Sequence, residues 1–376
     1  MFKTQSKRMV SGLAAAGLLS GALLGGPLMM AQAQAGPFEV IAKELDNPRG
    51  MAFGTDGALY VAEAGRGGTG PCMTVMRPEP VQNCYGPTGA VTRIANGKQE
   101  RIITGLPSLM TADGREVTGP HDLLPNGAHP PLVLMGLGAN PTLRRDLGVA
   151  GAFFGQLIRL DETGPVSLGD LAAAEAKLNP DGQAFDSNPF AVATSGGNRL
   201  VVDAGGNALL SIRPNGRVDK LAIFPTREVT APAFLKMPAG AKMPMQSVPT
   251  ALTVGSNGTI YVGELTGFPF PPKSARVFKV TAGREPQVYA EGFTNIIDLA
   301  LGRDGSLYVL EIATNGLTSE KTGGALIRIA PDGKRTTIAS DGLVMPTNVA
   351  VGPDGALYVA NFGVMPGKGE VVRIKP

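Results

Sequence analysis

The stretch LALGRDGSLYVLE at residues 299–311 decides the fold, because three close copies of it recur along the chain. The copies are MAFGTDGALYVAE at 51–63, LTVGSNGTIYVGE at 252–264 and VAVGPDGALYVAN at 349–361. Each copy reads as a short apolar strand, an Asp-Gly or Asn-Gly turn that tolerates positive φ, and a strand rich in Tyr and Val. The pattern therefore predicts the same β-hairpin at four places.

Two weaker copies begin at Pro120 and Pro189, and each of the six copies is followed by a further strand, expected at 90–94, 156–160, 208–212, 276–280, 325–329 and 370–374. A tight turn at 331–333 then opens a fourth strand at 335–339. The strong copies repeat at 47 residues (Gly258 to Gly305) and at 50 residues (Gly305 to Gly355), a period typical of a four-stranded propeller blade. With six copies, the sequence predicts an all-β, six-bladed β-propeller with four-stranded blades.

The chain ends on the third strand of the sixth blade. Residues 38–42 read like the other fourth strands and precede the first blade. We therefore expect this N-terminal strand to pair with residues 371–374 and close the ring, which leaves no open sheet edge. Only residues 170–178 look helical, being Ala-rich and followed by Asn179-Pro180, so an α/β fold is excluded.

The composition supports a folded, turn-rich chain. Of 376 residues 52 are Gly and 31 are Pro, yet 43% are hydrophobic and 17% are charged, the reverse of a disordered chain. With 2 His and 2 Cys, the chain cannot hold a multi-His metal centre, a Cys₄ zinc ribbon or a disulfide-dense scaffold.

Residues 1–35 read as a signal peptide, and residues 36–376 as the propeller. Basic residues 3, 7 and 8 precede an apolar stretch at 9–30, and Ala33-Gln34-Ala35 supplies a cleavage pattern. An uncleaved membrane anchor is the alternative, because the apolar stretch is long enough to span a bilayer. We expect cleavage, and a secreted or periplasmic monomer without a membrane span.

Charge gives no sign of a nucleic-acid partner. The formal net charge is +3, and all of it lies in the first 35 residues, because the rest of the chain balances 31 basic against 31 acidic residues. A neutral body without a basic run lacks the electrostatic footprint of a nucleic-acid-binding protein. The expected partner is a small molecule or another exported protein.

Cys72 and Cys84 lie 12 residues apart in a loop rich in Gly and Pro. In an oxidising compartment a disulfide between them is the default, and a catalytic thiol is the weaker alternative. This loop belongs to a set of long connections that the blade topology gathers on one face, where function is expected. The set comprises 64–89, 107–119, 139–154, 226–247, 265–274 and 313–323.

The hairpin pattern resembles the repeats of NHL propellers and of the senescence-marker-protein/gluconolactonase type. Longer stretches are similar to the exported ScyD/ScyE family: LDNPRG at 45–50, GPTGA at 86–90, TGPHD at 118–122, VGELTGFPFP at 262–271 and GFTNIID at 292–298. The resemblance covers nearly all of residues 36–376. It implies an exported propeller, and it brings no settled activity to carry onto residues of this chain.

Two polar columns emerge when the blades are aligned. The first follows the Tyr-Val strand and comprises Glu63, Gly136, Asp203, Glu264, Glu311 and Asn361; the second opens the innermost strand and comprises Gly50, Asp122, Ala191, Ala251, Asp298 and Asn348. Carboxylate and amide oxygens converging on the long-loop face suit Ca²⁺ or another divalent cation. We predict a cation site of Asp122, Asp298 and Asn348, with Glu63, Glu264 and Glu311 behind. The alternative is that the acids of the first column bond neighbouring backbone.

Other side chains are weaker candidates. His121 is a candidate catalytic base at the channel mouth, or a plain loop histidine. Arg49 and Arg66 are candidate anion ligands, although surface arginines are common. The stiff loop at 268–272 is either a binding lip or a cover over the blade edge.

Three function classes fit these features. The leading one is a binding or accessory module in the exported space. The second is a metal-dependent lactonase or related hydrolase, as the gluconolactonase resemblance implies. The third is a quinone-dependent sugar dehydrogenase. The fold does not choose among them, because function depends on the site.

Overall fold

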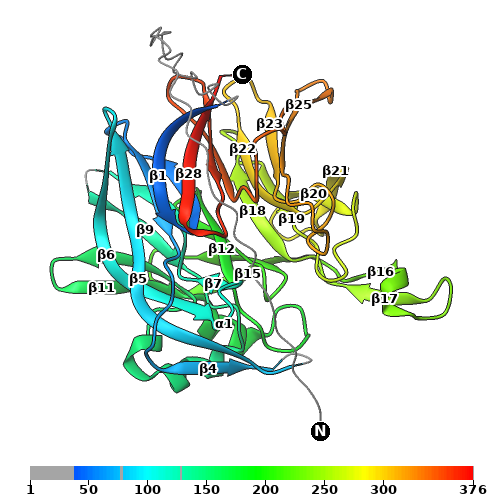
Figure 1. Cartoon of the computed structure of the whole chain (residues 1–376), viewed down its shortest axis with the longest axis horizontal. Helices are drawn as coiled ribbons and strands as arrows, with labels where there is room; N and C mark the ends of the chain where they lie inside the picture. The colour runs from blue at the N-terminus through cyan, green and yellow to red at the C-terminus, as the bar shows by residue number, and fades with distance from the viewer. Residues whose placement is uncertain (1–37, 77–78, 128, 376) are drawn as a thin grey trace, which may run out of the picture. The chain divides into compact units, whose positions relative to one another are not determined.

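The computed structural model of the protein describes residues 38–76, 79–127 and 129–375 (Figure 1). The predicted signal peptide and its cleavage site lie outside the described residues. The described residues form one compact unit. Within it, six antiparallel sheets carry the four-strand pattern, and a separate hairpin joins β16 (Arg227–Thr230) to β17 (Lys242–Met245).

Each of these six sheets is one blade, and its four strands are named below in order from the inner strand to the outer strand. The first three blades are β2 (Pro48–Phe53), β3 (Leu59–Glu63), β5 (Val81–Ala95) and β6 (Lys98–Thr111); β8 (Pro120–Asn126), β9 (His129–Met135), β10 (Gln156–Asp161) and β11 (Gly164–Asp170); and β12 (Pro189–Ser195), β13 (Asn198–Asp203), β14 (Ala208–Ile212) and β15 (Val218–Ile223). The last three are β18 (Pro249–Val254), β19 (Ile260–Glu264), β20 (Ala275–Val280) and β21 (Gln287–Phe293); β22 (Ile296–Leu301), β23 (Leu307–Glu311), β24 (Ala325–Ile329) and β25 (Arg335–Ala339); and β26 (Asn348–Val351), β27 (Leu357–Asn361), β28 (Pro366–Ile374) and β1 (Glu39–Asp46).

The inner strands meet in a closed ring. Strands β2, β8, β12, β18, β22 and β26 each contact the next in this order, and β26 contacts β2. The core consists of apolar layers between neighbouring blades, such as Val202 and Leu209 of the third blade against Val262 and Phe278 of the fourth. Val202 and Val262 lie on the second strands of their blades, and Leu209 and Phe278 lie on the third strands, so both middle strands supply these layers. The predicted six-bladed propeller is confirmed.

The N-terminal strand closes the ring as predicted. β1 pairs antiparallel with β28, with Glu39 opposite Arg373 and Val40 opposite Val372 (Figure 1, blue beside red). Leu45 of β1 is fully buried. The sixth blade is therefore built from both ends of the propeller chain.

The expected helix is present as α1 (Leu171–Leu178), with Asp170 as N-cap and Asn179 in the left-handed conformation after it. Several long connections are more ordered than the sequence indicates. β5 and β6 extend into a long hairpin that also carries β4 (Cys72–Val75) and β7 (Val117–Thr118). Residues 141–151 form a 3₁₀ segment, η1 (Pro141–Gly151), and the β16–β17 hairpin extends away from the blades (Figure 1).

The two cysteines form the predicted disulfide. Cys72 of β4 lies opposite Cys84 of β5 in the strand register, and their sulfurs are bonded. Both cysteines belong to the extended hairpin beside the long-loop face. The bond therefore ties β4 to the first blade.

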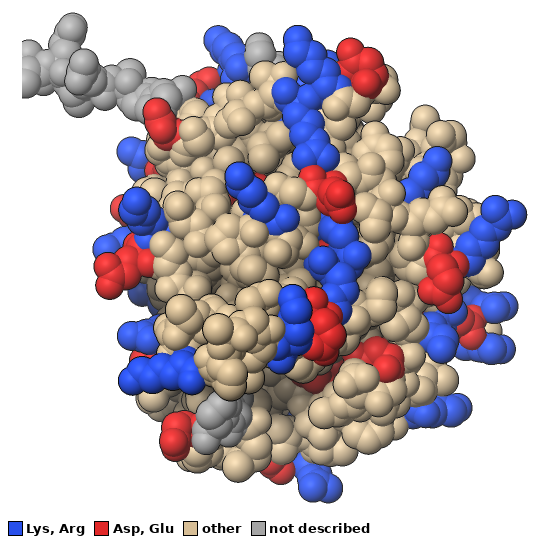
Figure 2. Space-filling view, turned by 90° about the vertical axis from the view of Figure 1, so that its right-hand side faces the viewer, with Lys and Arg blue, Asp and Glu red and all other residues tan. Residues whose placement is uncertain are grey.

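Charged side chains of both signs alternate over the side shown in Figure 2, with no continuous basic band. This agrees with the neutral charge balance of the propeller residues. No helix within the described part of the chain is long and apolar enough to cross a membrane.

Candidate functional site

The first polar column holds the chain in place where it enters five of the six blades. In four blades the column residue accepts an N–H from the segment leading to its own inner strand: Asp46 N to Glu63 (2.6 Å), Asn188 N to Asp203 (2.6 Å), Thr294 N to Glu311 (2.7 Å) and Val344 N to Asn361 (2.8 Å). In the fourth blade the Ser247 hydroxyl donates to Glu264 at 2.7 Å. These bonds are of the kind expected if the column residues hold neighbouring segments of the chain in place.

Two of these carboxylates are also neutralised by arginine. Glu63 is fully buried and receives Nε and Nη2 of Arg101 at 2.9 and 2.7 Å. Glu264 is fully buried between Arg227 and Arg276, each at 2.7 Å. Their oxygens are engaged, so neither carboxylate lies open to a ligand.

The second column links neighbouring blades. Asp122 accepts the Val192 N–H at 2.8 Å, Asp298 accepts the Val349 N–H at 2.8 Å, and Asn348 accepts the Met51 N–H at 3.1 Å. Each bond runs from one inner strand to the inner strand of the next blade. Position 50 requires glycine for a steric reason, because a Cβ there would lie 2.0 Å from an Asp122 oxygen.

The structure brings Asp122, Asp298 and Asn348 together around the axial channel, whereas Glu63, Glu264 and Glu311 are not among the residues that line it. No three His, Cys, Asp or Glu side chains in the described part of the protein are grouped so that they could hold a metal ion. Burial raises the pKa of Asp122 to about 7 and the pKa of Asp298 well above its usual value, with repulsion from Asp122 adding to the latter. Both side chains line the axial channel as hydrogen-bond acceptors in a region that disfavours their charge.

Replacing Asp298 by Asn is expected to stabilise the protein at alkaline pH. The Asn oxygen still accepts the Val349 N–H, as Asn348 does for Met51, while the cost of burying a charge disappears. Because the pKa of Asp298 is raised on folding, wild-type stability falls as the pH rises from the unfolded pKa through the folded pKa. We expect the variant to gain about 1–3 kcal/mol at high pH in urea unfolding.

The gain should shrink as the pH is lowered toward the unfolded pKa, at about 4, where both states keep the proton. Asp298→Ala is the matched control, since it removes the acceptor as well as the charge and should not stabilise. A gain for Asp298→Asn that is constant with pH would contradict this account.

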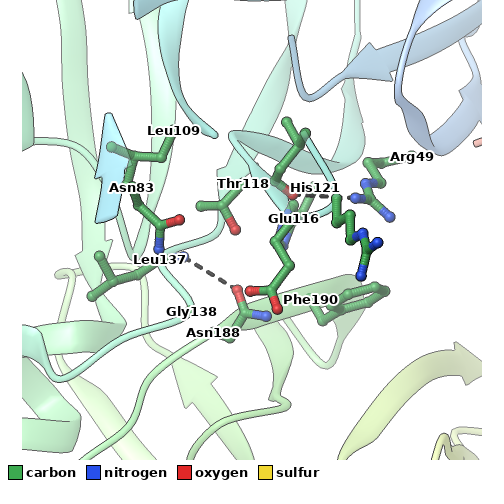
Figure 3. Close-up of a pocket in the computed structure, with 12 residues that line it drawn as sticks. Arg49, Asn83, Leu109, Glu116, Thr118, His121, Leu137, Gly138, Asn188 and Phe190 are labelled. Carbon is green, nitrogen blue, oxygen red and sulfur yellow. Dashed lines mark hydrogen bonds between the residues drawn. The ribbon is translucent and has the colours of Figure 1, made fainter. Parts of the chain in front are cut away.

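A pocket of about 230 Å³ opens on the long-loop side of the channel. It is built where the inner strands of the first three blades begin, with the extended β5–β6 hairpin as its other wall. In Figure 3, Arg49, His121 and Phe190 lie on one side, and Asn83, Leu109 and Leu137 lie on the other. The first three residues also line a small cavity that leads toward Asp122 and Asp298.

His121 is buried and neutral in this pocket. Its Nδ1 lies 3.0 Å from the Pro189 carbonyl oxygen, so Nδ1 carries the proton and Nε2 is left as an acceptor. Its ring packs against Phe190 with centroids 5.1 Å apart, and a Cβ at Gly136 would lie 2.2 Å from the imidazole. Gly136 thus replaces the acid of the first column and makes room for His121. Burial, with Arg49 nearby, lowers the pKa of His121 to about 3.

Arg49 extends from β2 into the same pocket. Its Nη2 donates to the Val117 carbonyl oxygen at 3.2 Å. Its Nε is buried and has no hydrogen-bond partner among the residues that the structure describes. Burial lowers the pKa of Arg49 to about 10, which reflects a cation held away from water.

Several pocket residues were missed by sequence reasoning. The side-chain oxygen of Asn188 accepts the Leu137 N–H at 3.2 Å, and its amide nitrogen takes no part in this bond (Figure 3). Asn83, Glu116 and Thr118 come from the extended hairpin and β7, which read as loops in the sequence. The one available signal was the position of Phe190 beside a weak copy of the repeat.

The remaining sequence candidates lie apart from the pocket. Arg66 is half-exposed and pairs with Asp46 at 2.6 Å, so its charge is already balanced. The loop at 268–272 places Phe268 on the surface, in edge contact with Phe234 at 6.1 Å. Neither feature lines the pocket of Figure 3.

No protein-family model matches the chain, and no curated protein matches it. Among solved structures, a calcium-binding regucalcin from Agrobacterium tumefaciens is 12% identical, with a TM-score of 0.49 over 90% of this chain and 95% of that one. Inactive virginiamycin B lyase from Staphylococcus aureus, solved with quinupristin, is 13% identical, with a TM-score of 0.46 over 90% and 89%. PQQ-bound aldose sugar dehydrogenase from Streptomyces coelicolor is 12% identical, with a TM-score of 0.47 over 90% and 96%. Likenesses this distant carry no argument about activity.

Proposed function

We propose that this protein is an exported propeller that binds a small molecule in the pocket of Arg49, His121 and Phe190. The observation that carries the proposal is the pocket itself. It is concave, it lies among the long connections, and it combines apolar walls with a few polar groups left open to a ligand. Export rests on the signal-peptide pattern of residues 1–35 and on the resemblance to the ScyD/ScyE family.

Binding without catalysis fits the electrostatics better than hydrolysis does. A general base works best with a pKa near the working pH, whereas the pKa of His121 is lowered to about 3. A neutral imidazole with a fixed tautomer is suited to accept a hydrogen bond from a ligand. The carboxylates Glu63 and Glu264 are held by arginines, so they are not placed to activate water.

The lactonase and the quinone-dependent dehydrogenase stay as alternative predictions, and so does the divalent cation. Asp122 and Asp298 line the same channel, and this observation supports the cation alternative. If Ca²⁺ binds there, it raises the melting temperature of the wild type, and Asp298→Ala abolishes the rise. If the two proteins respond alike, these residues do not bind Ca²⁺.

The binding function is tested by filling the pocket. Thr118 lines it, so Thr118→Phe should lower binding of a pool of small neutral and charged fragments by at least about tenfold, as detected by saturation-transfer NMR. Thr336→Phe is the matched control, because Thr336 is exposed on β25. Fragment binding that Thr118→Phe leaves intact would place the ligand elsewhere.

A further inference from the structure

We propose that the ligand of this pocket is a small organic carboxylate with a compact apolar body, and that Arg49 binds its carboxylate. This assignment rests on the proposed binding function and adds the chemical class of the ligand. It follows from the unused donors of Arg49, from the balance of charge around them, and from the apolar surface opposite.

The guanidinium of Arg49 has donors to spare. Its planar fork can offer two parallel N–H groups to one carboxylate. The bond from Nη2 to Val117 O uses one nitrogen, whereas the buried Nε has no partner in the described structure. Arg49 is part-buried, and a cation partly removed from water without a counter-ion is unfavourable, so a bound anion lowers that cost. The lowered pKa of Arg49 reflects the same environment.

The other polar groups set the charge of the site. Arg115 also lines the pocket, but it is exposed and pairs with Asp113 at 3.6 Å, and the pocket's one glutamate, Glu116, already interacts within the protein. His121 is neutral and adds no charge. Asn188 uses its carbonyl oxygen for the Leu137 N–H, which leaves its amide N–H groups as donors for a second ligand oxygen.

Apolar side chains define the rest of the ligand. Leu109 and Leu137 are almost fully buried, and they lie across the pocket from Phe190 (Figure 3). The volume of about 230 Å³ lies below the ~300–1,000 Å³ of pockets for drug-sized molecules. A single ring or a short branched chain bearing one carboxylate matches these walls.

The probe is benzoate, compared with benzamide, which has nearly the same shape and no charge. Isothermal titration of the wild type should show benzoate binding at least about tenfold more tightly than benzamide, since a charge-assisted bond is stronger than a neutral one. Arg49→Gln should remove this preference. Arg66→Gln should keep it, because Arg66 is paired with Asp46 outside the pocket. The wild-type comparison stands even if Arg49→Gln does not fold.

Equal affinity for the two probes overturns the carboxylate assignment and leaves the binding function intact. So does benzoate failing to bind while neutral fragments bind in the pocket. If inorganic phosphate competes with benzoate as strongly as acetate does, the site takes any small anion, and the carboxylate class is wrong. If no fragment binds, charged or neutral, the binding function itself is contradicted.

Discussion

A chain that begins at Asn47 instead of Gly36 is expected to lose its cooperative fold. The deletion removes β1, whose buried Ala42 and Leu45 pack on the sixth blade, and it exposes the full edge of β28. An unpaired β edge invites association with other chains. The lost contacts also span the seam between the last blade and the first, so the effect is comparable with the whole stability of a domain, about 5–15 kcal/mol.

The matched control is the chain that starts at Gly36, which keeps β1 and lacks only residues 1–35. Circular dichroism melting and size-exclusion chromatography compare the two. We expect a single sharp transition and a monomer for the control, and aggregation or no transition for the truncated chain. Equal melting temperatures would show that β1 does not close the ring.

Replacing Glu264 by Ala is expected to lower the free energy of unfolding by about 3–5 kcal/mol, because it leaves buried charges without their partner. Glu264 is fully buried, and its carboxylate joins Arg227, Arg276 and Ser247. Arg276 lies over the Phe278 ring, so it cannot turn to solvent without losing that contact. Urea unfolding measures the loss.

Asp161→Ala is the control for this ion pair. Asp161 bonds Arg159 at 2.7 Å on an exposed part of β10, where a salt bridge contributes little to stability. A Glu264→Ala loss as small as that of the exposed pair would mean that the first column does not hold the blades together. The control also checks that the unfolding method resolves small changes.

Much of the fold can be predicted from the sequence because short, local sequence patterns define the repeat. The Asp-Gly turns and the Tyr-Val strands fix each hairpin, and their period of about fifty residues fixes the blade. Closure by residues 38–42 follows from counting strands, and the structure confirms it. The disulfide follows from two cysteines and the expected compartment.

The site follows from the sequence only in part. Alignment of the blades found Asp122, Asp298 and Asn348 as a column, but it cannot show that their oxygens accept backbone N–H groups from the next blade. Those bonds depend on how the blades pack, which no single repeat encodes. The extended hairpin was missed for a related reason, since its Gly- and Pro-rich segments lack alternation and are ordered by pairing with β4 and β7.

The pocket therefore lies where the repeat is weakest. In the second blade Gly136 stands where Glu63 stands in the first, and His121 fills the space that this glycine leaves. A blade can depart locally from the repeat and form a binding site, because the other blades keep the ring closed. Phe190 also belongs to a weak copy, whereas Arg49 precedes a strong copy and reaches the pocket from the start of β2.

The central claim is that the ligand binds beside Arg49, His121 and Phe190, and a crystal structure of the protein soaked with small fragments tests it most directly. We predict a fragment bound between Arg49 and the Phe190 ring, within hydrogen-bonding distance of the Arg49 guanidinium. Fragments bound only elsewhere, such as the groove lined by Ala173, Lys177 and Lys220, with the pocket left empty, would contradict the account.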